Sequence, residues 1–187
     1  MIVTRSDLKE YIDYEKSLYY GGDKGSMLHA FLVGSKFYKI QRYLRILRIS
    51  EYHKNNQGLW HKILFALCHR KKHLMGARLG FEIPENCVGK GLMIYHIAPI
   101  VINEEATMGE NCMIAGNFCL GHKEKGQGAP KLGNNIYAGW GSCVIGNVKV
   151  ADGVVLGANA TLLSDVEKEN TNVAGTPARV VSPKAEK

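Results

Sequence analysis

The sequence predicts a three-sided parallel β-helix that follows a separate helical domain. Two observations lead to this prediction: a six-residue period from residue 102 to residue 167, and a different, helix-like pattern over residues 1–80. Neither the 3.6-residue helix period nor strict strand alternation produces a six-residue period. The first position is aliphatic in nearly every unit, at Ile102, Met108, Ile114, Leu132, Ala138, Val144, Val150, Leu156 and Leu162, and the fifth is mostly small or β-branched, at Ala106, Cys112, Phe118, Ile136, Ser142, Val148, Val154, Ala160 and Val166.

Turn-forming residues fill many positions between these apolar ones. Asn and Gly, as at Asn111, Gly116 and Asn135, tolerate the left-handed backbone that a tight corner needs. Short strands joined by such corners form a parallel β-helix, in which each coil pairs with its neighbours and no coil is stable alone. Six residues per side predicts about 18 residues per coil, so residues 83–173 would hold about five coils. The alternative is a β-sandwich rich in Gly and Asn.

Two interruptions of the period indicate where function lies. Ile94 and Ile102 are eight residues apart instead of six, and the extra residues fall around His96. Residues 121–131, GHKEKGQGAPK, keep the phase but contain no repeat, which predicts a loop at one corner of the prism. Loops on a rigid scaffold carry binding and catalytic residues more often than the scaffold does.

The remaining residues divide the chain into three parts. Within the helical domain, residues 1–80, we expect helices over Asp7–Tyr20, Ser26–Ser50 and Gly58–Leu74, with Gly21-Gly22 as a break. The β-helix is expected over residues 81–173, including the loop 121–131. Residues 174–187 would form a tail that caps the last coil.

Charge is unevenly distributed along the chain. Residues 1–80 carry 15 Lys+Arg against 6 Asp+Glu, whereas residues 81–187 carry 9 against 11. Basic residues recur every three positions at Lys36, Lys39, Arg42, Arg45 and Arg48. They predict either a solvated helix surface or contact with an acidic partner, such as an anionic membrane surface or a phosphate-bearing substrate. Nucleic acid is not expected, because no nucleic-acid-binding motif is recognisable.

Other features bear on location and on metals. A run of eighteen apolar residues and a secretory leader are both missing from the sequence, so a cytoplasmic protein is expected. The five cysteines are an odd number without metal-like spacing, which fits reduced thiols and no metal site. Cys112 occupies an inward repeat position and is expected to serve packing.

The repeats, a His in a widened unit, a long polar loop and a terminal GTPAR together resemble the hexapeptide-repeat acyltransferases, most closely the serine acetyltransferase branch. The resemblance covers about residues 80–182 and runs through FEI, VGKGLMIYHIAPIVINEEATMGENC, APKLGNNIYAGWGSCVIGNV and VAGTPARVV. The short helical part is similar to members found in capsule and lipopolysaccharide gene sets. The resemblance implies a left-handed β-helix, a homotrimer or a dimer of trimers, and acetyl transfer from acetyl-CoA to a hydroxyl without a metal.

The resemblance also implies a catalytic pair. His96 aligns with the family's catalytic histidine, a base of near-neutral pKa that takes the acceptor's proton as the hydroxyl attacks the thioester. Glu82 in FEI matches the acidic residue that accepts a hydrogen bond from the other ring nitrogen. Alternatively, His96 is a structural corner residue and Glu82 a surface carboxylate, in which case His122 in the loop is the other candidate base.

Acetyl-CoA is expected along the groove between neighbouring prisms, held by the coils and by the loop that begins at Gly121. Gly139 and Trp140 match the family's turn after the loop, and Ala158 lies one coil further on. Trp140 would either pack on the cofactor or seal the subunit interface. Two basic residues, Lys131 and Arg179, would either meet CoA phosphates or be surface charges.

The expected acceptor follows from departures from the serine enzymes. Those enzymes carry an Asp before the catalytic His, where this chain has Tyr95, and an Arg-His pair where it has Gly128 and Ala129. Without these groups the charges of free serine would lack partners. Tyr95, His122 and Ala129 are therefore expected to bind a sugar hydroxyl in surface-polysaccharide biosynthesis. Serine is the alternative acceptor, and a non-catalytic scaffold or binding module is the third reading.

Overall fold

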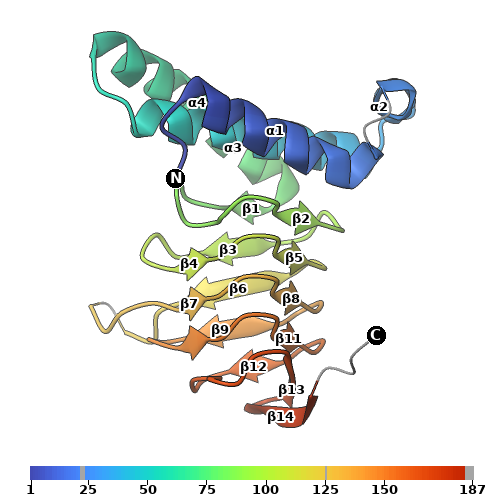
Figure 1. The fold of residues 1–187 in the computed structure, drawn as a ribbon, viewed down its shortest axis with the longest axis vertical. Helices are drawn as coiled ribbons and strands as arrows, with labels where there is room; N and C mark the ends of the chain where they lie inside the picture. Colours follow the sequence, from blue (N-terminus) through green and yellow to red (C-terminus); the bar gives the residue numbers. More distant parts are fainter. Residues whose placement is uncertain (22–23, 125, 184–187) are drawn as a thin grey trace. The chain divides into compact units, whose positions relative to one another are not determined.

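The computed structural model describes residues 1–21, 24–124 and 126–183. The chain divides into two compact units, one from Met1 to Phe81 and one that starts at Glu82. The first unit is helical and the second is built from short strands arranged in successive coils (Figure 1).

The helical unit contains α1 (Arg5–Tyr20), α2 (Lys24–Leu32), α3 (Lys36–Lys54) and α4 (Leu59–Leu79). A capping box starts α1: Thr4 Oγ1 accepts a hydrogen bond from Asp7 N at 3.0 Å, and the Asp7 carboxylate accepts one from Thr4 N at 2.8 Å. Gly21 ends α1 at φ +56°, while Gly22 of the predicted break lies outside the described residues.

The single helix predicted over residues 26–50 is wrong, because two helices occupy this stretch. Gly34 has φ +66°, a left-handed conformation that interrupts a right-handed helix. Ser35 then caps α3, its hydroxyl accepting a hydrogen bond from Phe37 N at 3.3 Å. A Gly followed by a Ser is a helix stop and start signal that the sequence did contain.

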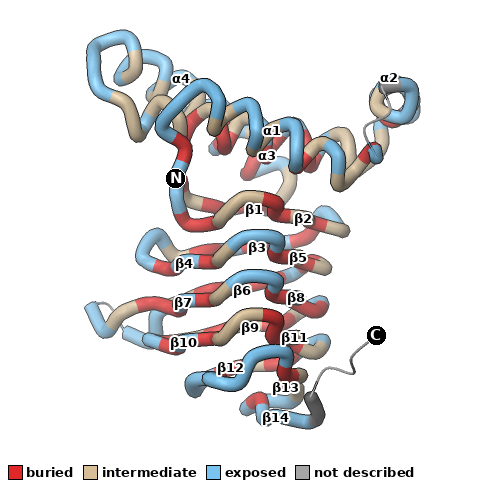
Figure 2. Tube along the Cα trace, in the orientation of Figure 1, coloured by how far each residue is buried: buried red, intermediate tan, exposed pale blue. Residues whose placement is uncertain are grey.

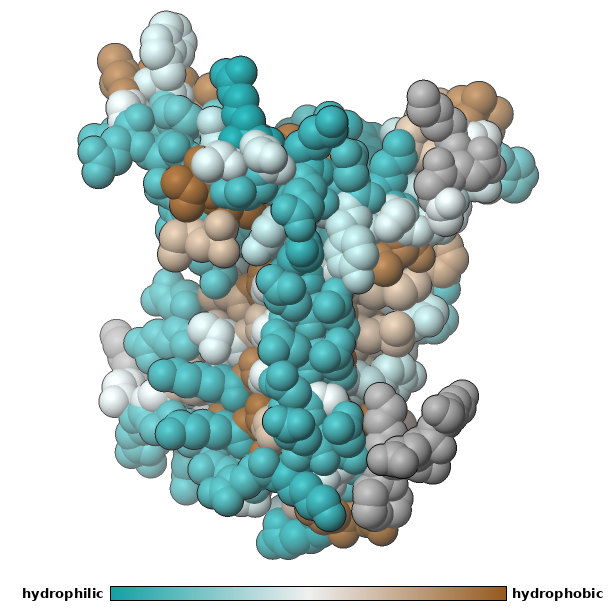
Figure 3. Space-filling view, viewed as in Figure 1, coloured by the Kyte–Doolittle hydropathy of each residue, from teal (hydrophilic) through white to brown (hydrophobic). Residues whose placement is uncertain are grey.

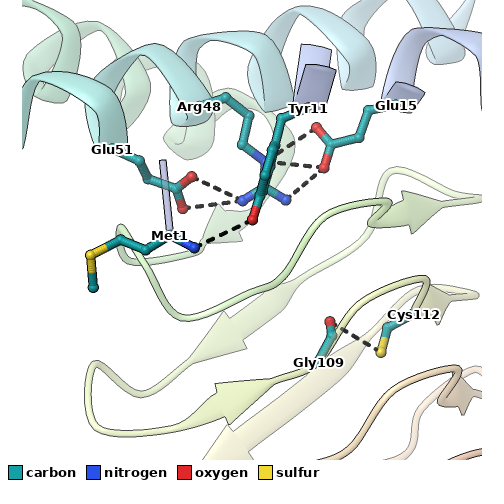
Figure 4. A network of polar contacts seen from close by, with 7 residues as sticks. All are labelled: Met1, Tyr11, Glu15, Arg48, Glu51, Gly109 and Cys112. Atoms are coloured by element: carbon teal, nitrogen blue, oxygen red, sulfur yellow. Dashed lines mark hydrogen bonds and ion pairs between the residues drawn. The ribbon is translucent and has the colours of Figure 1, made fainter. Parts of the chain in front are cut away.

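A buried ionic network joins α1 to α3 (Figure 4). Arg48 is fully buried; its Nη2 lies 2.6 Å from Glu15 Oε1 and its Nη1 lies 3.0 Å from Glu51 Oε2. Burial alone lowers the pKa of Arg48, but the two carboxylates outweigh burial and hold the pKa above its usual value. The predicted basic surface on α3 therefore does not include Arg48, which serves the interior of the helical unit instead.

Fourteen short strands follow in the described part of the chain, most of them two or three residues long. They form three parallel sheets, in the orders β1-β3-β6-β9-β12, β4-β7-β10 and β2-β5-β8-β11-β13, with β14 antiparallel at the edge of the last. The strands are β1 (Phe81–Glu82), β2 (Met93–Ile94), β3 (Ile100–Ile102), β4 (Thr107–Met108), β5 (Met113–Ile114), β6 (Phe118–Gly121), β7 (Lys131–Leu132), β8 (Tyr137–Ala138), β9 (Cys143–Ile145), β10 (Lys149–Val150), β11 (Val155–Leu156), β12 (Thr161–Leu162), β13 (Thr171–Gly175) and β14 (Ala178–Pro183).

Strand register confirms the predicted coil. Tyr137 pairs with Val155 and Cys143 pairs with Thr161, in each case 18 residues apart. From β2 to β12, consecutive strands belong to different sheets and every third strand returns to the same sheet, which gives a three-sided parallel β-helix. A β-sandwich is excluded because, apart from β14, the strands pair in parallel. Residues 184–187 of the predicted tail lie outside the described residues.

The interior of the prism consists of the repeat positions that the sequence singled out. Every first-position and fifth-position residue of the repeat is at most 6% exposed. Buried and exposed stretches alternate around each coil (Figure 2). Stacked aliphatic side chains at these positions therefore form a continuous core along the prism.

The three outer faces of the prism differ in polarity. Outward positions on the β3-β6-β9-β12 sheet include Val101, Cys119 and Cys143, and those on the β2-β5-β8-β11 sheet include Met93, Met113, Tyr137 and Val155. Val101 and Tyr137 are each 40% exposed. The third sheet instead presents Thr107, Lys131 and Lys149 in one row. Two faces are thus suited to contact with another protein surface and one to solvent.

Candidate active site

His96 lies on a widened corner of the first coil. Ile94 pairs with Ile114, and Ile100 pairs with Phe118. The first coil therefore has two more residues than the second between the same two register points, as the sequence predicted. His96 lies within this wider stretch and is exposed.

The Trp140 ring packs against the His96 imidazole. The two ring centroids are 5.8 Å apart, and the ring planes meet at 75° in an edge-on arrangement. Ile94, Ile114 and Ala138 are inward residues in register on one sheet. His96, Gly116 and Trp140 come two residues after them, so these three occupy equivalent positions in three successive coils. Trp140 can therefore contact His96 only across Gly116.

Gly116 leaves the space that Trp140 occupies. A Cβ at Gly116 would lie 2.5 Å from Trp140 Cζ3 and 3.4 Å from Ala98 Cβ. Its φ of +146° is also in the region that L side chains rarely adopt. The contact between Trp140 and His96 therefore depends on glycine at this position.

We expect Gly116→Ala to displace Trp140 and to lower the free energy of unfolding by about 1–3 kcal/mol. The displacement is measured by tryptophan fluorescence in a Trp60→Phe background, where Trp140 is the remaining tryptophan. The control is Gly146→Ala, since Gly146 has φ +98° but its Cβ would meet nothing closer than Lys123 Cβ at 3.9 Å. Unchanged Trp140 emission in Gly116→Ala would show that the indole is held in some other way.

A stripe of mostly small residues runs along the outside of the six-stranded sheet, beginning next to His96. Each residue of the stripe comes directly after an inward residue that pairs with its neighbours in the sheet. The stripe lies close to the backbone: a Cβ at Gly139 would clash with Leu156 O at 2.6 Å. β13 ends the stripe, and there Ala174 pairs with Arg179 of β14. At about 4.8 Å per strand, its four steps span about 19 Å. The members are Tyr95, Ala115, Gly139, Gly157 and Ala174.

This stripe can accept an elongated ligand. Its lack of bulky side chains after Tyr95 lets a ligand lie against the backbone of the coils. One end of such a ligand would lie at the imidazole of His96 and the other at the guanidinium of Arg179. Ala158 follows Gly157 and is exposed, one coil beyond Trp140, and Asn159 N donates a hydrogen bond to Trp140 O at 2.7 Å. Gly139, Trp140 and Ala158 are therefore neighbours.

The predicted loop projects from a different corner of the prism. It connects Gly121, at the end of β6, to Lys131, at the start of β7. His122 Nδ1 lies 2.7 Å from Asn103 Nδ2, and Asn103 Oδ1 accepts a hydrogen bond from Glu105 N at 2.9 Å. The Asn103 amide is thereby oriented to donate to His122 Nδ1, which assigns the proton to Nε2. In this tautomer neither ring nitrogen of His122 has a free lone pair, so His122 is a poor candidate base.

No protein-family model matches the chain. The serine acetyltransferase of Synechococcus elongatus is 34% identical over 132 residues, which is 69% of this chain and 54% of the relative. The serine acetyltransferase of Staphylococcus aureus strain N315 is 34% identical over 136 residues, which is 66% of this chain and 63% of the relative. The chain thus spans less than two thirds of the length of either relative.

Solved structures of serine acetyltransferases superpose on this chain. Soybean serine acetyltransferase superposes with a TM-score of 0.72 at 26% identity, covering 93% of this chain and 69% of that one. A serine acetyltransferase solved as a complex with CoA gives the same TM-score at 22% identity, over 95% of this chain and 71% of that one. At this low identity the superposition shows that the fold is shared. The chain is thus similar in sequence and in fold to serine acetyltransferases. The left-handed parallel β-helix implied by the resemblance is confirmed.

The structure separates several residues that resemblance to the hexapeptide-repeat family grouped together. Lys131 lies in register with Thr107 and Lys149, on the polar sheet rather than on the stripe that leads to His96. Ala129 is only 3% exposed and belongs to the loop, whereas Tyr95 precedes His96 at the other end of β3. Within one prism these acceptor candidates therefore do not meet, because β3 and β6 separate the two corners.

Glu82 lies on β1 and is exposed. Over residues 1–21, 24–124 and 126–183, no hydrogen bond or ion pair joins Glu82 to His96. The pair implied by the hexapeptide-repeat family is thus not assembled in the single chain. Trp140 is the side chain that packs against His96, a contact that was not predicted from the sequence. The signal was available, since His96 and Trp140 share one position of the repeat two coils apart.

Cys112 serves packing. Its Sγ lies 3.5 Å from the carbonyl oxygens of Gly109, Glu110 and Gly133. Burial raises the pKa of the Cys112 thiol to about 11, so the nucleophilic thiolate is scarce near neutral pH. Among the described residues, no three His, Cys, Asp or Glu side chains are placed to hold a metal ion.

Proposed function

We propose that the protein is an acetyl-CoA-dependent O-acetyltransferase in which His96 is the general base. The observation that carries the proposal is an exposed histidine on a widened coil, at one end of a stripe of small residues. The names of the curated relatives support the reaction class. Because these relatives are longer, the activity of the whole protein is part of the proposal.

The reaction is a direct transfer. The imidazole of His96 takes the proton of the acceptor hydroxyl as its oxygen attacks the thioester carbonyl carbon. The tetrahedral intermediate collapses with cleavage of the carbon–sulfur bond, and the imidazolium returns its proton to the CoA thiolate. An acetyl ester and free CoA result, with no net change in the enzyme. Contact with the Trp140 ring restricts the imidazole and so favours a productive orientation.

The stripe gives acetyl-CoA a defined direction. The acetyl end would lie by His96 and Trp140, the pantetheine arm would follow Gly139 and Gly157, and the phosphates would lie near Arg179. Ala158 would border the same path. Lys131 lies on another face, so we assign it no part in this site.

A homotrimer, alone or as a dimer of trimers, would complete the site. Two of the three outer faces are apolar and would pack against neighbouring prisms. In one chain the His96 corner and the corner that carries Gly121 and His122 are separate. A neighbouring chain could place its loop against the His96 corner, with Ala129 supporting the loop from its buried position. The orienting role of Glu82 likewise remains a proposal.

L-serine is the acceptor we assign first. The curated relatives are named for serine, and a soybean serine acetyltransferase solved in complex with serine superposes with a TM-score of 0.72 at 25% identity, over 93% of this chain and 69% of that one. A sugar hydroxyl is the second candidate, favoured by Tyr95 beside His96. It is also favoured by Gly128 and Ala129, since neither provides a charge for a free amino acid. Acetyl-CoA supply and five free cysteines fit action in the cytoplasm.

Acceptor identity is tested by release of free CoA thiol from acetyl-CoA with L-serine and with a panel of sugars and nucleotide sugars. We expect thiol release with L-serine, and O-acetylserine in the product. Release only with a sugar would instead establish the second candidate. If CoA binds and no acceptor in the panel is acetylated, the enzymatic reading fails in favour of a binding module.

A further inference from the structure

Helix α4 exposes many apolar side chains along one side. Six of its side chains, each between 39% and 75% exposed, are Leu59, Trp60, Ile63, Leu64, Leu67 and Leu74. At about 100° per residue they fall on an arc of about 140°. A helix on the surface of a globular protein normally turns polar residues outward. Figure 3 shows hydrophobic atoms at the upper left of the view, where Figure 1 draws the N-terminal part of α4.

The opposite side of α4 is packed within the helical unit. Gly76 is buried, and a Cβ there would meet the carbonyl oxygen of Phe81 and the ring of Tyr43. Tyr43 in turn meets Phe81 edge-on, with ring centroids 5.2 Å apart. Gly76 lies about 170° around the helix from the middle of the apolar arc. The arc is therefore the outward side of a helix already anchored by its other side.

Charge indicates what covers the arc. α4 contains five Lys and Arg residues and no Asp or Glu. Three of these, Arg70, Lys71 and Arg78, are exposed and fall inside the same arc as the leucines. Leucine and tryptophan side chains enter the headgroup layer of an anionic membrane, and the long stems of Lys and Arg on the same side let their charges reach the lipid phosphates.

We propose that α4 docks the protein on an anionic membrane surface, with its axis in the membrane plane. A second copy of α4 is a poorer occupant, because Arg70, Lys71 and Arg78 would approach their equivalents without an acidic residue from either helix. No helix in the described part of the chain is long and apolar enough to cross a membrane, so the interaction is interfacial. The proposal is independent of acetyl transfer.

The test is co-sedimentation of the full chain with phosphatidylcholine vesicles and with vesicles that also contain phosphatidylglycerol. We expect binding to the anionic vesicles that is about tenfold tighter than to the neutral ones and that weakens as salt is added. Leu67→Glu should lower this binding about tenfold, because it places a carboxylate at the centre of the apolar arc.

The matched control is Leu32→Glu, since Leu32 is an exposed leucine of α2 at 72% exposure and the substitution makes the same change in charge. We expect Leu32→Glu to bind like the unmodified chain, and both variants to acetylate the acceptor at the original rate. Equal binding to neutral and anionic vesicles, or equal loss of binding in both variants, would overturn the proposal. So would a fall in oligomer mass in Leu67→Glu, which would assign the face to a second copy.

Discussion

Replacing His96 with alanine is expected to lower the rate of acetyl transfer by about 10²–10⁴-fold, the range that general-base catalysis contributes. The acceptor hydroxyl would then have to attack the thioester while still protonated. The substitution leaves the stripe and the neighbouring Arg179 untouched, so the affinity for CoA should stay within about twofold of the original. The rate is measured by thiol release and the affinity by calorimetry with CoA.

His122→Ala is the matched control for this experiment, since both variants remove an exposed imidazole. His122 carries its proton on Nε2 and accepts a hydrogen bond at Nδ1 from Asn103, so its loss should reduce the rate much less than the loss of His96. A His96→Ala enzyme with nearly full activity, or a His122→Ala enzyme that is the more impaired of the two, would refute the assignment of the base.

The second large effect concerns stability. Arg48→Ala leaves the carboxylates of Glu15 and Glu51 buried without their shared cation, and removal of one partner from a buried ion pair costs about 3–5 kcal/mol. We expect the free energy of unfolding of the helical unit to fall by that amount. Far-UV circular dichroism during denaturant titration of the full chain measures the loss of helix.

Arg45→Ala provides the comparison for Arg48→Ala, because Arg45 is an exposed arginine on the same helix. Removing a solvated surface charge should change stability by at most about 0.5 kcal/mol. If Arg48→Ala and Arg45→Ala unfolded at the same denaturant concentration, the network would not be holding α1 to α3.

The repetitive half of the chain was predictable because the position of a residue within the six-residue repeat determines whether its side chain is buried. Ile114, Leu132 and Val144 recur at one position of a six-residue unit, and all three are buried at the predicted register. The widening around His96 was visible for the same reason, as a departure from a strict period. The sequence pattern is sufficient here because every coil packs against its neighbours in the same way.

The rest depended on contacts between residues distant in sequence. Arg48 looked like one of five evenly spaced surface cations, and only the packing of α1 against α3 brings Glu15 to it. The contact between Trp140 and His96 requires the register of three coils and the missing side chain of Gly116. Residues from the loop and the His96 corner were grouped by resemblance, whereas one prism keeps them apart.

The most direct test of the account is the structure of the protein in complex with CoA. We expect the thiol to lie beside His96 and Trp140, the pantetheine arm to follow Gly139 and Gly157, and the phosphates to lie near Arg179. CoA bound on the polar sheet beside Lys131 and Lys149, or with its thiol at the far end of the stripe, would contradict acetyl transfer at His96.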